Sequence, residues 1–244
     1  MIHPFIPKTV RTRLSGTIVE SLYRRYQIST TELTREQFHT PVTSFEMLVP
    51  KGHPFLIKAG PKGEEHEPLL AQELNKNLKA DTVFYDVGAR FGYHTLLLRE
   101  LGIPESQIHA FEGDKLAFWV LQQNHTETDN LTNAFVSDGK SDLSLDEYLS
   151  ENPHPDIIKI DVEGAEGEVL RGLEENLHEN IKIYVEIHTG RMEEFGDEPW
   201  DLVQLLDKSG FDIHVADHRQ NTEKFVPVSH QGSLPSGNYL LKAV

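Results

Sequence analysis

The sequence predicts an α/β fold with a mostly parallel β-sheet and helices on both faces. Short apolar runs rich in β-branched and aromatic residues alternate with amphipathic helical segments, as in a sheet built from β-α-β units. Two further runs near the C-terminus are joined by a long polar loop, which predicts a last strand that runs antiparallel. The seven expected strands are 83–85, 107–111, 133–137, 156–162, 182–188, 211–215 and 238–243.

The segments between these runs have helical periodicity and recognisable ends. Pro68 suits the first turn of a helix, Ser144 is a candidate N-cap, and glycines at positions 102 and 210 end two other helices. Upstream, a Pro-Lys-Gly-His-Pro turn at 50–54 predicts a hairpin over 45–58. The expected helices are 16–26, 67–78, the segment from Gly92 to Gly102, 114–124, 143–149, 165–176 and 199–209.

Composition excludes several classes of protein. The 244 residues carry a formal net charge of −16, which argues against non-specific nucleic-acid binding. The absence of cysteine excludes a disulfide framework, a thiolate nucleophile and Cys-ligated zinc. We find neither an apolar run of the length that spans a bilayer nor a secretory signal, and therefore expect a cytoplasmic protein.

The central motif is the strand–loop–helix segment DTVFYDVGARFGYHTLLL, residues 81–98. Its glycines, Gly88 and Gly92, follow Asp86 with the spacing Asp-x-Gly-x-x-x-Gly. That spacing differs from the Gly-x-Gly-x-x-Gly turn that cradles a pyrophosphate. We expect Gly88 to allow a sharp turn and Gly92 to allow close approach of a ligand. We interpret the loop as a site for S-adenosyl-L-methionine (SAM), an adenosyl cofactor without phosphate.

The first 60 residues are expected to form an appendage, a helix and a hairpin, on a cofactor-binding domain of residues 61–244. Residues 1–30 contain five Lys or Arg and one Glu, against the overall charge. The helix expected over 16–26 can contact a membrane surface or a partner, or it can pack on its own domain, which is the commoner use of an amphipathic segment.

Four segments together resemble the FkbM-type SAM-dependent methyltransferases: VFYDVGARFGYHT, HAFEGD, DIIKIDVEGAEGEVLRG and IYVEIH. The resemblance extends over residues 81–190, and KIDVEGAE is its most specific part. It implies a class I methyltransferase fold with a Rossmann-like sheet, and an enzyme that methylates hydroxyl groups of small molecules, sugars or lipids. Two departures are Arg90, where the family often has Asn, and Gly113-Asp114, where a proline is usually nearby.

The expected cofactor contacts lie at the ends of strands. Glu112 follows the glycine loop at the distance where related folds place the carboxylate that binds ribose. Asp86 is expected to reach the methionine amino group, and Asp138 either holds the adenine amine or makes an Asx-type turn. Arg90 can pair with the cofactor carboxylate or cover the site. The full expected set is Asp86, Gly88, Arg90, Gly92, Glu112, Asp138 and Asp161.

Methyl transfer to a hydroxyl benefits from a base beside the methyl group. His188, at the end of the fifth strand, is the expected base, and Asp161 or Glu163 is expected to orient it or the substrate. We expect no metal, although Asp161, Glu163, Glu186 and His188 form an oxygen-rich set that suits Mg²⁺ or Mn²⁺.

The preferred hypothesis is an O-methyltransferase that acts on a hydroxyl of a small molecule, sugar or glycan. One alternative is a methyltransferase-like scaffold or regulatory subunit without activity. The other is a nicotinamide-dependent oxidoreductase, which would require the dinucleotide turn that this sequence lacks.

Overall fold

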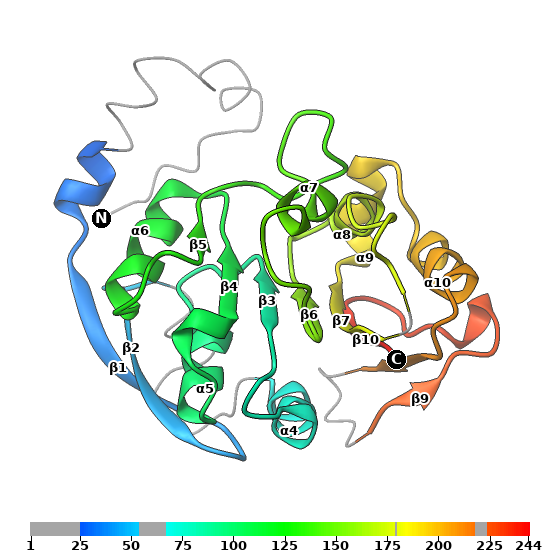
Figure 1. The fold of residues 1–244 in the computed structure, drawn as a ribbon, viewed down its shortest axis with the longest axis horizontal. Coiled ribbons are helices and arrows are strands. Elements are labelled where there is room, and N and C mark those ends of the chain that lie inside the picture. Colours follow the sequence, from blue (N-terminus) through cyan, green and yellow to red (C-terminus); the bar gives the residue numbers. More distant parts are fainter. Residues whose placement is uncertain (1–24, 54–66, 179, 218–223) are drawn as a thin grey trace.

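The computed structural model describes residues 25–53, 67–178, 180–217 and 224–244. Its central sheet has the strand order β5-β4-β3-β6-β7-β10-β8-β9, which Figure 1 shows running from left to right across the molecule. The strands from β5 to β7 are parallel, and β10 is antiparallel to both β7 and β8. The predicted α/β class and the antiparallel strand near the C-terminus are confirmed.

The strands of the central sheet are short and mostly buried. They are β3 (Phe84–Val87), β4 (Ile108–Phe111), β5 (Leu131–Thr132), β6 (Ile157–Ile160), β7 (Lys182–Ile187), β8 (Ile213–Ala216), β9 (Val226–Pro227) and β10 (Tyr239–Ala243). The helices are α4 (Pro68–Asn77), α5 (Tyr93–Glu100), α6 (Lys115–Asn124), α7 (Leu145–Leu149), α8 (Glu166–Arg171), α9 (Thr189–Met192) and α10 (Pro199–Lys208).

Helices cover both faces of the sheet because their apolar sides alternate between two cores. Figure 1 shows α4 and α5 on one side of the sheet and α7, α8 and α10 on the other. The first core includes Leu70, Leu74 and Leu97, packed against Phe84 and Tyr184. The second core includes Leu145, Leu149, Val169, Leu170, Leu202 and Leu206, packed against Tyr85, Val87 and Ile160.

A separate hairpin of β1 (Leu33–His39) and β2 (Ser44–Pro50) packs beside α5 and α6. This hairpin lies upstream of the predicted one, whose second half, 54–58, lies outside the described residues. The chain reverses at 40–43, where the Thr40 hydroxyl oxygen accepts hydrogen bonds from the amides of Val42 and Thr43. The Pro-Lys-Gly turn at 50–52 instead follows β2. The boundary predicted near residue 60 lies outside the described residues, but the hairpin side chains Phe38, Phe45, Met47 and Val49 share a core with α4 and α5.

The third strand is β5 at Leu131–Thr132 rather than 133–137, and the two-residue β9 raises the number of strands in the central sheet to eight. Most of the helix expected over 16–26 lies outside the described residues. Among the described ones, residues 25–30 are helical. None of the helices in the described part of the chain is long and apolar enough to cross a bilayer.

Candidate functional site

The candidate site lies at the carboxyl ends of β3, β4, β6 and β7, which are adjacent in the sheet. Parallel strands present these ends along one edge, where ligands bind in open α/β sheets. Asp86 lies within β3, Glu112 follows β4, Asp161 follows β6, and His188 follows β7. The order of the strands thus brings most of the predicted site residues to a single edge.

The glycine loop turns sharply because Gly88 and Gly92 have left-handed backbones, with φ of +83° and +94°. A Cβ at residue 88 would lie 1.9 Å from the carbonyl oxygen of Asp161, so Gly88 also permits close approach of the β6 end. A Cβ at residue 92 would lie 2.8 Å from the side chains of both Leu121 and Thr95. Both glycines therefore have packing roles within the protein. The sequence analysis instead attributed Gly92 to the close approach of a ligand.

The amides of this loop are already hydrogen-bonded within the protein. Those of Gly88 and Ala89 donate to the carbonyl oxygen of Phe111, at 2.9 and 3.0 Å, and that of Gly92 donates to Ala89 at 2.8 Å. The amide of Arg90 donates to the Glu112 carboxylate at 2.8 Å. A pyrophosphate would need such amides to be available.

Glu112 joins the glycine loop to the start of α6. One of its oxygens accepts from the Arg90 amide, and the other accepts from the Asp114 amide at 2.6 Å. Burial raises the pKa of Glu112 above its usual value, although these backbone hydrogen bonds oppose the shift. Each carboxylate oxygen has a second lone pair, so both can still accept from ribose hydroxyls.

An exposed aromatic ring lies directly beside Glu112. Phe135 is 64% exposed, and a Cβ at Gly113 would come within 2.2 Å of its ring. Asn133 links the same segment to β4 by donating to the carbonyl oxygen of Glu112 at 2.7 Å. Gly113 therefore permits an accessible ring to lie against the backbone that follows the expected ribose carboxylate.

Asp86 and Lys159 form a buried charged pair across neighbouring strands. Their exposed fractions are 0% and 3%, and Lys159 Nζ lies 3.3 Å from Asp86 Oδ1 and 3.4 Å from Asp161 Oδ2. Burial lowers the pKa of Lys159, but the carboxylates of Asp86 and Asp161 outweigh it and raise the pKa overall. Neither oxygen of Asp86 accepts a hydrogen bond from another described residue. A buried carboxylate with this spare capacity fits the ammonium group of the expected cofactor.

The imidazole of His188 is 5% exposed and has a different environment on each side. Its Nδ1 lies 2.7 Å from Oε1 of Glu166, a buried carboxylate at the start of α8. Its Nε2 faces three carboxylates, with Glu186 Oε1 at 3.6 Å and both Asp161 Oδ1 and Glu163 Oε2 at 3.7 Å. The structure thus brings together all three predicted catalytic residues.

The carboxylates around His188 control its protonation. Burial alone would lower the pKa of His188, but the hydrogen bond to Glu166 and the charge of Asp161 raise it overall. Burial raises the pKa of Glu186, and the nearby charges of Asp161 and Glu67 add to the effect. Both shifts favour the protonated forms of these two groups.

The same groups can hold a divalent cation. Ligand atoms of Asp161, Glu186 and His188 all lie within 4.8 Å of one another. Oxygen ligands with one imidazole suit Mg²⁺ or Mn²⁺. Glu163 lies next to this set and pairs with Arg191 at 2.7 Å.

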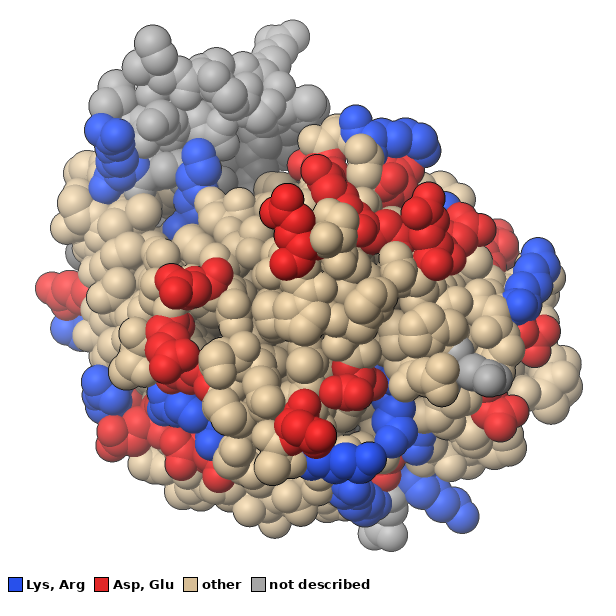
Figure 2. All heavy atoms as spheres, in the orientation of Figure 1, with Lys and Arg blue, Asp and Glu red and all other residues tan. Residues whose placement is uncertain are grey.

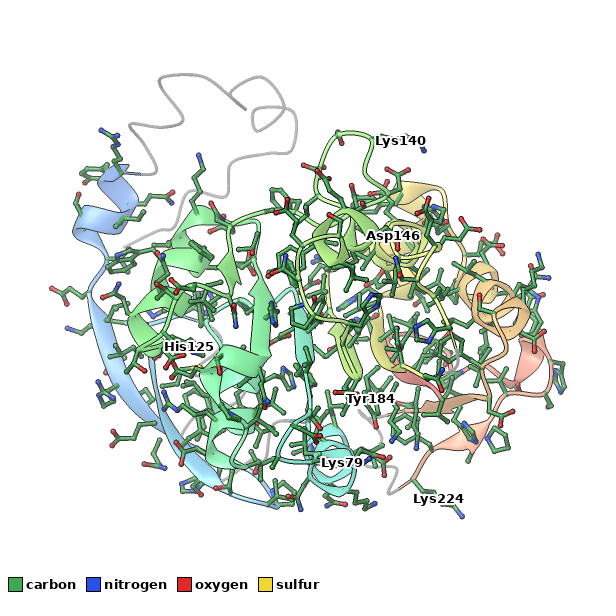
Figure 3. The ribbon with its side chains drawn as sticks, viewed as in Figure 1. Lys79, His125, Lys140, Asp146, Tyr184 and Lys224 are labelled. Carbon is green, nitrogen blue, oxygen red and sulfur yellow. The ribbon has the colours of Figure 1, made fainter. Side chains whose placement is uncertain are left out.

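Asp138 lies in the loop before α7 and is not joined to the rest of the predicted set by any hydrogen bond or ion pair seen in the described ranges. Its carboxylate pairs with Lys140, whose side chain Figure 3 shows at the outer tip of that loop. It also lines a groove with Ser144, Asp146, Glu147, Arg171, Gly172, Glu174 and Glu175. Figure 2 shows acidic side chains gathered over this region of α7 and α8.

Sequence reasoning missed three residues of the site: Lys159, Glu166 and Phe135. A lysine inside the apolar run DIIKIDV was a usable signal, because a buried lysine requires a carboxylate partner. Glu166 belongs to the quoted motif KIDVEGAE but received no role. Phe135 was assigned to a strand, and nothing in its local sequence indicates exposure.

Residues 113–213 match the family described as the Methyltransferase FkbM domain. The Hexuronic acid methyltransferase AglP of Haloferax volcanii is 26% identical over 173 residues, which cover 58% of this chain and 68% of that protein.

Similar solved structures are methyltransferases. The tRNA (uracil-54, C5)-methyltransferase of Pyrococcus abyssi, solved with S-adenosyl-L-homocysteine, has a TM-score of 0.50 and 14% identity over 87% of this chain and 44% of that one. Methyltransferase FkbM from Methylobacillus flagellatus has a TM-score of 0.48 and 16% identity over 69% of this chain and 45% of that one. The mostly parallel sheet with helices on both faces is thus a Rossmann-like fold that the Pyrococcus abyssi methyltransferase shares, and residues 113–213 of this chain are similar to the Methyltransferase FkbM domain.

Proposed function

We propose that this protein transfers a methyl group from SAM to a hydroxyl group of a sugar, with hexuronic acids as the first class to test. The observation that carries the proposal is the position of His188. Its Nε2 lies among carboxylates at the same sheet edge as the glycine loop and Glu112.

The proposed cofactor contacts use the spare capacity of the site. Asp86 binds the ammonium group, Glu112 accepts from the ribose hydroxyls, and Phe135 stacks on the adenine, while Gly88, Arg90 and Gly92 shape the loop. Asp138 is retained as the proposed contact to the adenine amine. SAM supplies the electrophilic methyl group, so the protein's task is mainly alignment.

His188 is the proposed general base, acting through Nε2. The raised pKa keeps its imidazole protonated in the free site. A positive ligand beside Asp161 offsets part of the negative charge that holds this proton, and so favours the neutral imidazole. Asp161 and Glu163, both 3.7 Å from Nε2, orient the ring or the acceptor hydroxyl.

The charge of the site favours a hydroxyl acceptor over a carboxylate. Asp161, Glu163 and Glu186 surround Nε2, and a sugar carboxylate placed there would meet like charges. The relative's name supports a hexuronic acid as substrate, and such a sugar offers both groups. We therefore propose that a methyl ether is formed rather than a methyl ester.

The alternatives predict different ligands. A nicotinamide-dependent oxidoreductase would require loop amides for a pyrophosphate, whereas those of residues 88–90 and 92 have partners in the protein. A scaffold without activity requires neither a base nor spare acceptors at this sheet edge, and the environments of His188 and Asp86 argue against it.

The test begins with calorimetry of SAM, S-adenosyl-L-homocysteine and NADH binding. We expect both adenosyl ligands to bind and NADH not to bind.

Radiolabelled SAM is then supplied with a panel of hexuronic acids, neutral hexoses and their glycosides, in EDTA or in excess Mg²⁺. Label that remains on the sugar after mild alkali indicates an ether, whereas label that is released indicates an ester. Binding of NADH alone would contradict the proposal, and binding of SAM without turnover on any sugar would favour the scaffold. Turnover only with Mg²⁺ would assign a cation to Asp161, Glu186 and His188.

A further inference from the structure

We propose that Glu166 is a positioning residue that fixes the tautomer and orientation of His188, so that Nε2 and not Nδ1 is the nitrogen that receives the proton. This inference rests on the proposed function for its catalytic meaning. Its structural part, the choice of tautomer, stands on the contacts of Glu166 alone.

Glu166 is held in place from two sides. It is fully buried, and its Oε1 accepts from the Gly164 amide at 3.0 Å while lying 2.7 Å from His188 Nδ1. Gly164 can present its amide in this way because its φ is +119°. A Cβ at Gly164 would lie 2.9 Å from Arg191 Cβ, so the loop before α8 packs closely on α9, which begins directly after His188.

The fixed carboxylate dictates which ring nitrogen carries hydrogen. A carboxylate can only accept, so Nδ1 must donate, and the neutral ring then has its lone pair at Nε2. Nε2 is also the nitrogen that faces the carboxylates of Asp161, Glu163 and Glu186. The neutral alternative, with hydrogen on Nε2, would leave Nδ1 and Glu166 as two acceptors 2.7 Å apart.

Glu166 also stabilises the imidazolium that forms when Nε2 takes the proton from the acceptor. Its second oxygen is buried without a hydrogen-bond partner among the described residues, so its charge is little screened. This is the role that the carboxylate has in a Ser-His-Asp triad, where it orients the ring without taking the proton itself.

The simpler alternative is that Glu166 only caps the loop through Gly164. Asp197 provides a matched control, because it is also buried, lies between α9 and α10, and is bound to Arg171 of α8 at 2.7 and 3.0 Å. Within the described part of the chain, no hydrogen bond or ion pair joins it to His188. Loss of either carboxylate disturbs packing around α8, but only the loss of Glu166 removes the partner of His188.

The experiment is ¹⁵N NMR of the histidine rings in the full chain, at a pH where they are neutral, with His188→Gln used to assign the His188 signal. We expect hydrogen on Nδ1 of His188 in the wild type, a mixture of tautomers in Glu166→Gln, and the wild-type tautomer in Asp197→Asn. Hydrogen on Nε2 in the wild type, or an unchanged tautomer in Glu166→Gln, would overturn the proposal. If Glu166→Gln does not fold, the wild-type tautomer, assigned with His188→Gln, decides the matter.

Kinetics with a sugar that supports turnover gives the second measurement. We expect Glu166→Gln to lower kcat by about 100-fold, with KM and affinity for S-adenosyl-L-homocysteine within about twofold of wild type. Asp197→Asn is expected to keep kcat within about threefold. Equal kcat in Glu166→Gln and wild type would overturn the positioning role. The NMR result needs neither SAM nor sugar, so it can succeed or fail independently of the proposed function.

Discussion

The side-chain amide of Asn124 pairs with the backbone of Leu48 as a neighbouring strand would. Its oxygen accepts from the Leu48 amide at 2.7 Å, and its nitrogen donates to the Leu48 carbonyl at 2.9 Å. The same nitrogen donates to the carbonyl of Phe91, in the glycine loop, at 2.8 Å. One side chain at the end of α6 thus ties β2 to the loop that is expected to hold the cofactor.

Replacement of Asn124 should reveal this connection. Asn124→Ala removes three hydrogen bonds and is expected to lower the free energy of unfolding by about 2 kcal/mol. Asn124→Asp has nearly the same shape but places a carboxylate oxygen against two carbonyls, so it should be less stable than the alanine variant. Urea unfolding of both variants measures the order. An aspartate variant as stable as wild type would show that the pairing with Leu48 contributes nothing.

A second prediction concerns Glu112, whose carboxylate receives the Arg90 and Asp114 amides. Hydrogen bonds to a charged group contribute about 1.5–3 kcal/mol. Glu112→Ala should therefore raise the Kd of S-adenosyl-L-homocysteine by at least about tenfold in calorimetry. Glu105→Gln is the control, because Glu105 also accepts from two backbone amides, those of Thr126 and Glu127 rather than those of Arg90 and Asp114. If both variants bind as wild type does, Glu112 only holds the loop in place.

Much of this edge of the sheet was predictable from the sequence. Glu112 and His188 each follow a short β-rich run, and the parallel order of the strands then places their ends together. Local periodicity also located α4 and α10, and the predicted N-cap Ser144 does accept from the Glu147 amide. These features depend on residues that are close together in the chain.

What the sequence did not predict depends on contacts between distant segments. Glu166 meets His188 across 22 residues, and Asn124 meets Leu48 across 76. The hairpin of β1 and β2 was not predicted because its turn contains no glycine, whereas the stronger Pro-Gly signal lies ten residues later, at the end of β2. Phe135 was assigned to a strand by its apolar neighbours, although the short pairing with β4 is made by Leu131 and Thr132, four and three residues earlier.

A third prediction tests Phe135 as the adenine platform. Stacking of a base on an aromatic side chain contributes about 1–3 kcal/mol. Phe135→Ala should therefore weaken the binding of S-adenosyl-L-homocysteine by about tenfold or more. Phe135→Tyr should bind this ligand as tightly as the wild type does. Phe195 is a suitable control, because it is also exposed but lies in the short 3₁₀ helix Glu193–Phe195 that follows α9. Equal affinity in Phe135→Ala and Phe195→Ala would remove Phe135 from the cofactor site.

A fourth prediction concerns the stability of the fold as pH falls. His109 in β4 is 2% exposed, its Nδ1 lies 2.8 Å from the hydroxyl of Tyr148, and its ring packs 4.9 Å from that of Tyr85. Burial lowers the pKa of His109 from 6.5 to about 4. Between these values the unfolded chain binds a proton that the folded protein excludes, so the contribution of His109 to stability is present above pH 6.5 and is lost as pH falls towards 4.

The matched variant is His109→Gln, which keeps a polar side chain but cannot titrate. We expect it to be less stable than wild type at pH 7 because it packs less well against Tyr85 and Tyr148. On acidification, however, the variant should lose less stability. The free energy of unfolding of the wild type should fall by up to about 3 kcal/mol more than that of the variant. Urea unfolding of both proteins between pH 7 and pH 4 measures the difference. Parallel curves would mean that His109 titrates alike in the folded and unfolded states, and that its burial in β4 does not exclude the proton.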